Sequence, residues 1–326
     1  IYMIPSSFCT ICNKFYKEEL LCFLLTLSFH HENEIIYILC DKEVKTFLNE
    51  ITPKPKLKIK IYSTLNRFSL MKKTDMLKMG IWNDFQLMKM DIMKHAIENG
   101  GDTLYLDCDN VILSRLDGID KNKQLGVSKS YTKKKIKDER GKYSGGMLWC
   151  NNINIIDDWK KLTYNSRYYD QAAIETLVER YNNFDFGENY DFQKNTFSND
   201  RYTEKEIASK IISLNDKIYY NKLELKNIHI RFTKKLDSID NYILLKLRES
   251  RFYKEILCIF RCINKKWLIH IPKQPTDDEM FKHKNDRFRQ LAFLMKLNNN
   301  DVEIEYTNQT YHCWLHPDVL LYDRPS

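Results

Sequence analysis

Glycine and proline are scarce in this chain, with 9 and 7 residues among 326. Such low contents exclude collagen-like sequence and the Gly-rich or Pro-rich compositions of disordered proteins. The chain also lacks a long hydrophobic segment, because its longest apolar run, residues 20–29, is about half of the ~20 residues that a transmembrane helix requires. No signal peptide is visible, so we expect a cytoplasmic protein.

Cysteine is present without the spacing of a zinc site. Cys9 and Cys12 form one CxxC pair among 9 cysteines, and no second pair completes a four-ligand site. Scattered thiols suit a reducing compartment. The formal charge of +8 favours an anionic partner such as a phosphate, a nucleic acid or an anionic lipid.

The order of the elements is that of an α/β protein. An apolar strand at residues 1–4 is predicted to end in a turn at 5–7, followed by a helix that reaches residue 29. Further strands are predicted at 34–40 and 57–63, with a helix between them. Alternation of strands and helices is typical of a parallel sheet with helical crossovers.

The stretch TLYLDCDNVIL, residues 103–113, interrupts an apolar run with Asp107 and Asp109. Residues two apart in an extended chain point to the same side, so the two carboxylates share a face. They stand where a strand ends, which is where open parallel sheets bind ligands. Such a pair repels unless a cation such as Mg²⁺ or Mn²⁺ shares it. A solvated strand end, or carboxylates that cap neighbouring backbone, are the structural alternatives.

Three features flank these aspartates. Lys89 lies at the edge of the apolar stripe of the preceding helix, either as a snorkelling lysine or aimed at an anion near the sheet. In YSGGMLWCNN, paired glycines in a Gly-poor chain indicate a turn into a strand and close backbone approach to another group, with a simple bulge as the alternative. Asp170 opens a helix, where it serves either the helix dipole or a ligand. The charged run between them, residues 129–144, is predicted to be a loop.

In this order, the motifs resemble those of nucleotide-sugar-dependent glycosyltransferases of the GT-A fold, in the branch with retaining galactosyl-, glucosyl- and glycogenin-type enzymes. The matching pieces are the helix with Lys89, LYLDCD as the DxD motif, YSGGMLWCN, the Asp-Gln pair at 170–171, SLNDKIYYN and HIRFTKK. The resemblance covers about residues 1–235 and implies a Rossmann-like mixed sheet flanked by helices, forming the catalytic domain.

Residues 236–326 fall outside this resemblance. Two amphipathic segments rich in basic and aromatic residues predict a mainly helical C-terminal extension. The extension packs on the main domain, contacts the acceptor or rests on a membrane surface. A further domain beyond residue 326 is also open.

The resemblance implies a site for a UDP-sugar or GDP-sugar donor and a hydroxyl acceptor such as a glycan, with no nucleic-acid partner. Asp107, Asp109 and His229 would bind Mn²⁺ or Mg²⁺, and Asp170 would face the anomeric centre as general base or as a stabiliser of the cationic sugar. The residues assigned to the donor are Pro5, Ser6, Lys89, Asp107, Ser144, Gly145, Lys234 and Lys235.

Alternatives remain at the sequence level. The segment after His229 departs from the family's glycine and Lys-Pro-Trp pattern, so His270 is an alternative third ligand. The motif at Asp107 also fits a haloacid-dehalogenase-type phosphatase, in which this aspartate would be the nucleophile. The basic charge, with Lys133 to Lys135, fits a non-enzymatic nucleic-acid-binding module.

Overall fold

A computed structural model provides the architecture. It describes residues 2–50, 55–130, 134–193, 209–214, 217–229, 269–271, 302–306 and 309–313.

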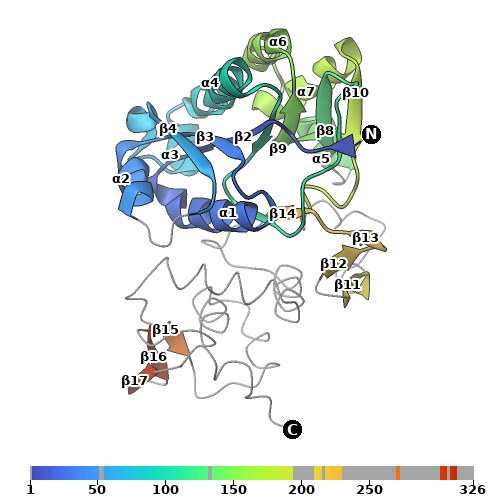
Figure 1. Cartoon of the computed structure of the whole chain (residues 1–326). Coiled ribbons are helices and arrows are strands. Elements are labelled where there is room, and N and C mark those ends of the chain that lie inside the picture. Colours follow the sequence, from blue (N-terminus) through green and yellow to red (C-terminus); the bar gives the residue numbers. More distant parts are fainter. Residues whose placement is uncertain are drawn as a thin grey trace.

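A seven-stranded mixed sheet with the order β10-β8-β9-β5-β2-β3-β4 forms the centre of the fold (Figure 1). Strand β9 runs antiparallel to its neighbours β5 and β8, and the other adjacent pairs are parallel. In sheet order, the strands are Asn183–Phe186, Leu125–Lys129, Tyr143–Cys150, Thr103–Leu106, Ser7–Cys12, Ile35–Cys40 and Lys58–Ser63. The fold is therefore the mixed α/β class with a mostly parallel sheet, which confirms the predicted class.

Helices cover both faces of this sheet. Helices α1 and α2 lie on one side, and α4, α6 and α7 lie on the other (Figure 1). The α-helices are α1 Lys17–His30, α2 Lys42–Glu50, α3 Lys73–Lys78, α4 Trp82–Gly100, α5 Lys134–Arg140, α6 Ile153–Tyr164 and α7 Tyr169–Arg180, and the 3-10 helices are Lys14–Tyr16 and Leu65–Phe68.

The period of two along the strands explains these two layers. In β2, Phe8 and Cys12 belong to the core under α1, while Cys9 and Ile11 belong to the core under α4. Successive side chains of β2 point to opposite faces of the sheet, and all of them are buried. The strand therefore packs against the helices on both faces. Cys9 and Cys12 are free thiols in separate cores, so the CxxC pair forms no zinc site.

Short strands complete the described part. Strand β1 pairs with β7, β6 pairs with β14, β11 to β13 form one small sheet, and β15 to β17 form another. Their bounds are β1 Tyr2–Met3, β6 Asn110–Ile112, β7 Ile119–Asp120, β11 Ile211–Leu214, β12 Lys217–Tyr220, β13 Leu223–Glu224, β14 Asn227–His229, β15 Ile269–Ile271, β16 Val302–Tyr306 and β17 Gln309–Cys313.

Three local predictions need correction. Strand β1 at Tyr2–Met3 lies within the strand predicted at 1–4, but the turn predicted at 5–7 runs into β2, a fully buried strand that was not predicted. The charged run 129–144, predicted as a loop, contains α5. The Ser-Gly-Gly predicted as a turn lies inside β9.

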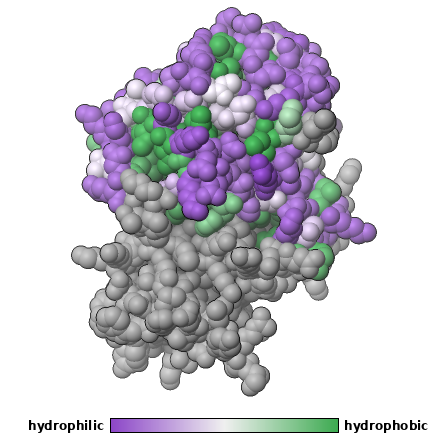
Figure 2. Space-filling view, viewed as in Figure 1, coloured by the Kyte–Doolittle hydropathy of each residue, from purple (hydrophilic) through white to green (hydrophobic). Residues whose placement is uncertain are grey.

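The C-terminal part is described only at β15, β16 and β17, which are strands where a mainly helical extension was predicted. The two amphipathic segments predicted as helices lie outside the described residues, and the boundary at about residue 235 stays a prediction. Within the described residues, no helix combines the length and the apolar character needed to cross a membrane. On the coloured part of the face in Figure 2, hydrophilic residues predominate, and apolar residues gather in a few patches.

Candidate functional site

A cavity of about 560 Å³ lies at the carboxyl ends of β2 and β5, where parallel sheets bind ligands. Its volume is in the range of small-molecule sites. Among its lining residues are Asn13, Lys89, Asp107, Asp109, Ser144, Gly145, Asp170, Asp191, Gln193 and His229.

Asp107 and Asp109 stand directly after β5, and Asp109 is almost fully buried. The backbone N–H of Asp107 donates to the carbonyl of Gly146 on the adjacent strand at 2.9 Å, which fixes the chain as it leaves the sheet. Oδ1 of Asp107 accepts a hydrogen bond from the Tyr105 hydroxyl at 2.7 Å. The two carboxylates are therefore held by the sheet rather than by a flexible loop.

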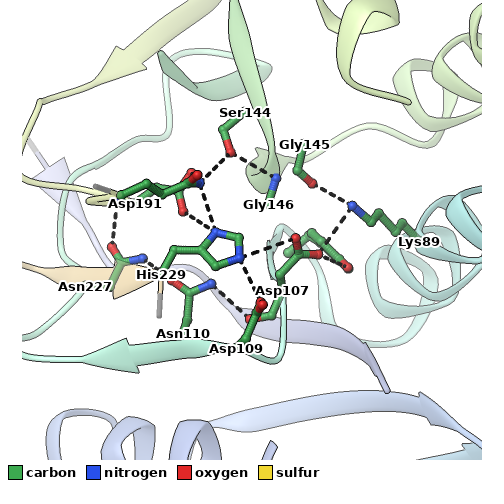
Figure 3. A network of polar contacts seen from close by, with 12 residues as sticks. Lys89, Asp107, Asp109, Asn110, Ser144, Gly145, Gly146, Asp191, Asn227 and His229 are labelled. Carbon is green, nitrogen blue, oxygen red and sulfur yellow. Dashed lines mark hydrogen bonds and ion pairs between the residues drawn. The ribbon is translucent and has the colours of Figure 1, made fainter. Parts of the chain in front are cut away.

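His229 reaches these carboxylates through strand pairing. Strand β14 pairs antiparallel with β6, and this register sets His229 opposite Asn110, the residue that follows Asp109. Its Nε2 lies 2.8 Å from Oδ1 of Asp109 and 3.9 Å from Oδ2 of Asp107. Figure 3 shows the imidazole directed at both carboxylates.

The three side chains fit a divalent cation. Each offers one ligand atom, and the three atoms lie within 4.8 Å of one another. Two carboxylate oxygens and one imidazole nitrogen form a donor set that suits Mn²⁺ and accepts Mg²⁺. Among the described residues, Asp107, Asp109 and His229 are the one group of this kind.

The electrostatics of the cluster favour positive charge. Burial lowers the pKa of His229, but the carboxylates of Asp109 and Asp191 outweigh burial and hold that pKa well above its ordinary value. The same carboxylates that stabilise a proton on the ring would stabilise a metal ion beside it.

Lys89 connects the cluster to a second carboxylate. Its Nζ donates to Oδ2 of Asp170 and to the carbonyl of Gly145, both at 3.0 Å, and lies 3.3 Å from Oδ1 of Asp107. Burial alone would lower the pKa of Lys89, but Asp107 and Asp170 raise it above its ordinary value. The side chain is 6% exposed, so the snorkelling alternative is wrong and the ammonium points into the site.

The paired glycines permit close packing at this point. A Cβ at Gly145 would lie 2.6 Å from Oδ2 of Asp170, and a Cβ at Gly146 would lie 2.8 Å from Cε1 of His229. Any other residue at either position would displace a charged side chain of the site. Close backbone approach, not a simple bulge, therefore explains the Gly-Gly pair.

Asp170 occupies the first turn of α7, and its side chain is 7% exposed. Burial raises the pKa of Asp170, and the Lys89 ammonium offsets only part of that rise. Trp159 Nε1 donates to the backbone carbonyl of Asp170 at 2.8 Å, which anchors this end of the helix.

Several residues assigned from sequence lie elsewhere. Pro5 and Ser6 precede β2 and stand at the amino end of the sheet, where Ser6 donates to Asp102. Neither residue is among those that line the cavity, and their assignment to the nucleoside, which depended on a strand at residues 1–4, stays a prediction. His270 lies on β15. Lys234 and Lys235 lie outside the described residues.

The sequence also missed part of the site. Asp191 and Gln193 contact Nδ1 of His229, and Asn227 bonds both to the backbone of Asp191 and to Asn110 (Figure 3). No local pattern marks Asp191 and Gln193, because both lie outside any regular helix or strand, and Asn227 only begins the short strand β14. Their contacts with the site exist only because β14 places His229 beside them.

Solved glycosyltransferases show a distant likeness to this chain. The apo structure of the bifunctional glycosyltransferase WbbM has a TM-score of 0.47 at 11% identity, over 79% of this chain and 52% of that one. The galactosyltransferase LgtC, solved with donor and acceptor sugar analogues, has a TM-score of 0.45 at 13% identity, over 68% of this chain and 86% of that one. An active-site mutant of LgtC has a TM-score of 0.43 at 12% identity, over the same shares of the two chains.

The chain thus spans about half the length of WbbM. No family model matches the chain. No curated protein matches it either. At this level of identity, the activities of those enzymes do not transfer, so the function depends on the side chains of this site.

Proposed function

We propose that the chain is a divalent-metal-dependent glycosyltransferase that moves a sugar from a UDP-sugar to an acceptor hydroxyl. One observation carries the proposal: the Asp107, Asp109 and His229 ligand atoms lie within 4.8 Å of one another, and the Lys89–Asp170 pair faces the same cavity. A divalent cation beside the buried Lys89 would supply positive charge for a diphosphate. The Asp170 carboxylate beside them would supply negative charge for a sugar that becomes cationic in the reaction.

Each charged group has a role in this proposal. Asp107, Asp109 and His229 would hold Mn²⁺ or Mg²⁺, which supplies Lewis-acid stabilisation of the diphosphate as its charge grows. Lys89 adds a buried positive charge near the leaving oxygen, where a fixed charge in a dry site is worth more than in water. Gly145 and Gly146 let Asp170 and His229 approach β9 closely, which keeps both side chains at the wall of the cavity.

The transfer step breaks the bond between the anomeric carbon and the diphosphate oxygen, which keeps the electron pair. The acceptor hydroxyl oxygen forms the new bond to that carbon. In an inverting reaction, Asp170 takes the hydroxyl proton; in a retaining reaction, its charge stabilises the cationic sugar and the proton leaves with the diphosphate. The anomeric configuration of the product, read by NMR, separates the two.

The test measures binding and turnover together. With Mn²⁺ present, UDP should raise the melting temperature of the full chain, and incubation with UDP-sugars should release UDP. Asp109→Asn should remove the metal-dependent shift and reduce UDP release by roughly 10²–10³-fold, as expected when one group that stabilises transition-state charge is lost. Asp157→Asn is the matched control, because its carboxylate pairs with Lys94 on the surface.

Three results would count against the proposal. One is the absence of any metal-dependent shift with UDP or GDP. The second is full activity of Asp109→Asn. The third is a covalent aspartyl phosphate on Asp107 after incubation with a phosphomonoester, which would support the phosphatase alternative instead.

A further inference from the structure

Asp191 has no role in the sequence motifs, yet it lies against the proposed ligand His229 on the side away from the two aspartates. We propose that Asp191 is a positioning residue for the metal site: it accepts a hydrogen bond from Nδ1–H of His229 and so turns an unprotonated Nε2 toward Asp107 and Asp109. The inference rests on the proposed metal site and adds the residue that selects the ligand's tautomer.

The geometry defines this role. Oδ1 of Asp191 lies 3.2 Å from Nδ1 of His229, on the edge of the ring opposite the Nε2 contact with Asp109. The Asp191 side chain is 1% exposed, so water does not compete for the imidazole. A ring held by a carboxylate on one nitrogen presents the other nitrogen in a fixed direction, and such a partner typically matters about 10–100-fold for metal affinity.

The backbone of Asp191 is strained, and hydrogen bonds hold it in place. Its φ of 48° lies in the left-handed region that non-glycine residues seldom adopt. The backbone N–H of Asp191 donates to Oδ1 of Asn227 at 3.0 Å, and Asn227 in turn donates to Asn110 at 2.7 Å. The strained residue is thus tied to the two strands that carry His229 and follow Asp109, as expected where strain serves a site.

Gln193 competes with Asp191 for Nδ1 of His229. Its Nε2 lies 2.9 Å from Nδ1 of His229, a contact that favours the tautomer with no proton on Nδ1. The same amide donates to Oδ2 of Asp191 at 3.2 Å. The two neighbours therefore select opposite tautomers, and the ionised carboxylate prevails because charge-assisted hydrogen bonds are stronger than neutral ones.

The experiment uses Mn²⁺ alone, without nucleotide, and measures its affinity for the full chain by EPR at fixed pH. Asp191→Asn keeps the size and tolerates the positive φ, but it removes the charge. Asp191→Gly also fits that φ and removes the acceptor altogether. Both variants should bind Mn²⁺ about 10–100-fold more weakly than the unaltered chain. Asp157→Asn should bind as the unaltered chain does.

A spectroscopic reading separates positioning from general damage. In the presence of Mg²⁺, ¹⁵N NMR should show the His229 proton on Nδ1 in the unaltered chain, whereas in Asp191→Asn a larger fraction of molecules should have an unliganded imidazole with its proton on Nε2. Unchanged Mn²⁺ affinity in both Asp191 variants, while His229→Ala weakens binding, would overturn this inference alone. Weakened binding with an unchanged tautomer would also overturn it. If the unaltered chain binds no Mn²⁺, the metal site and the proposed function fail with it.

Discussion

Asp102 and Asp170 are both largely buried carboxylates with a lysine partner. They lie at opposite ends of the strands of the central sheet, here called its amino edge and its carboxyl edge. Asp102 precedes β5 at the amino edge, and Asp170 faces the cavity at the carboxyl edge. Their side chains are 12% and 7% exposed, so burial hardly distinguishes them. What differs is the number of donors that each one meets.

Asp102 is surrounded by donors. Ser6 donates through both its N–H and its hydroxyl, Trp149 Nε1 donates at 2.8 Å, and Lys121 Nζ donates at 3.1 Å. Burial alone would raise the pKa of Asp102, but its hydrogen bonds, the largest from Ser6, bring that pKa below the ordinary value. A carboxylate satisfied in this way ties the amino edge together and has little capacity left for a ligand.

Asp170 has far fewer partners. Among the described residues, Lys89 is the one side chain that donates to it, and its pKa is raised where that of Asp102 is lowered. A carboxylate that has few hydrogen-bond donors and lies at the wall of a cavity is available to a substrate. The comparison teaches that the count of donors, rather than burial or charge, separates a structural acid from a candidate catalytic one.

The largest expected effect comes from Asp170→Asn. If Asp170 acts on the sugar or the acceptor, the variant should lose about 10²–10⁴-fold in kcat, the usual contribution of a general base, with a melting temperature close to that of the unaltered chain. Release of nucleoside diphosphate gives the rate, and circular dichroism gives the melting temperature. Asp102→Asn is the control and should keep its activity per folded molecule; a tenth or more of the activity left in Asp170→Asn would break the comparison.

The next effect is on stability at the other edge. Asp102→Asn replaces one carboxylate oxygen by an NH₂ group, which would face the hydrogen-bond donors that surround Asp102. The free energy of unfolding should therefore fall by about 1–3 kcal/mol. Urea unfolding measures the change. Asp157→Asn loses an ion pair whose partners are each 40% exposed and should fall by less than about 1 kcal/mol. Equal losses in the two variants would show that the donors around Asp102 do not stabilise the fold.

The smallest effect is the pH dependence of these differences. Because the pKa of Asp102 is lowered by folding, its stabilisation is present above the ordinary value of 3.8 and is lost as the pH falls through the lower folded value. The stability gap between the unaltered chain and Asp102→Asn should therefore close in acid. For Asp170, whose pKa is raised, the direction reverses: the stability of the unaltered chain relative to Asp170→Asn should rise as the pH falls. Urea midpoints between about pH 3 and pH 7 measure both gaps, and gaps that change in the same direction with pH would contradict the contrast.

Local pattern was enough to predict much of the sheet and part of the site. The helix with Lys89, the strand before Asp107 and the helix that opens at Asp170 all follow from the pattern of apolar residues. Scarcity of glycine made the Gly-Gly pair informative, and the structure shows the close contacts behind it. These features depend on neighbours in the chain.

Non-local contacts explain what the sequence did not reveal. The direction of Lys89 depends on acceptors from two later segments, Gly145 and Asp170. Asp191 stands at a positive φ outside any regular element, so no periodicity marks it. The position predicted for Pro5 and Ser6 depended on a strand at residues 1–4, whereas the strand of the central sheet is β2, whose pairing with β3 and β5 is not visible in the local sequence.

The pairing of β14 with β6 brings together segments that are far apart in the sequence. The hydrogen bond between Asn227 and Asn110 joins residues 117 positions apart, whereas Lys89 and the two aspartates are close in sequence. Closing so long a loop is entropically demanding and comes late unless other contacts shorten it. A chain that stops or is cut before β14 would therefore carry the aspartates without their histidine, and binding at the proposed metal site would report that the chain extends through His229.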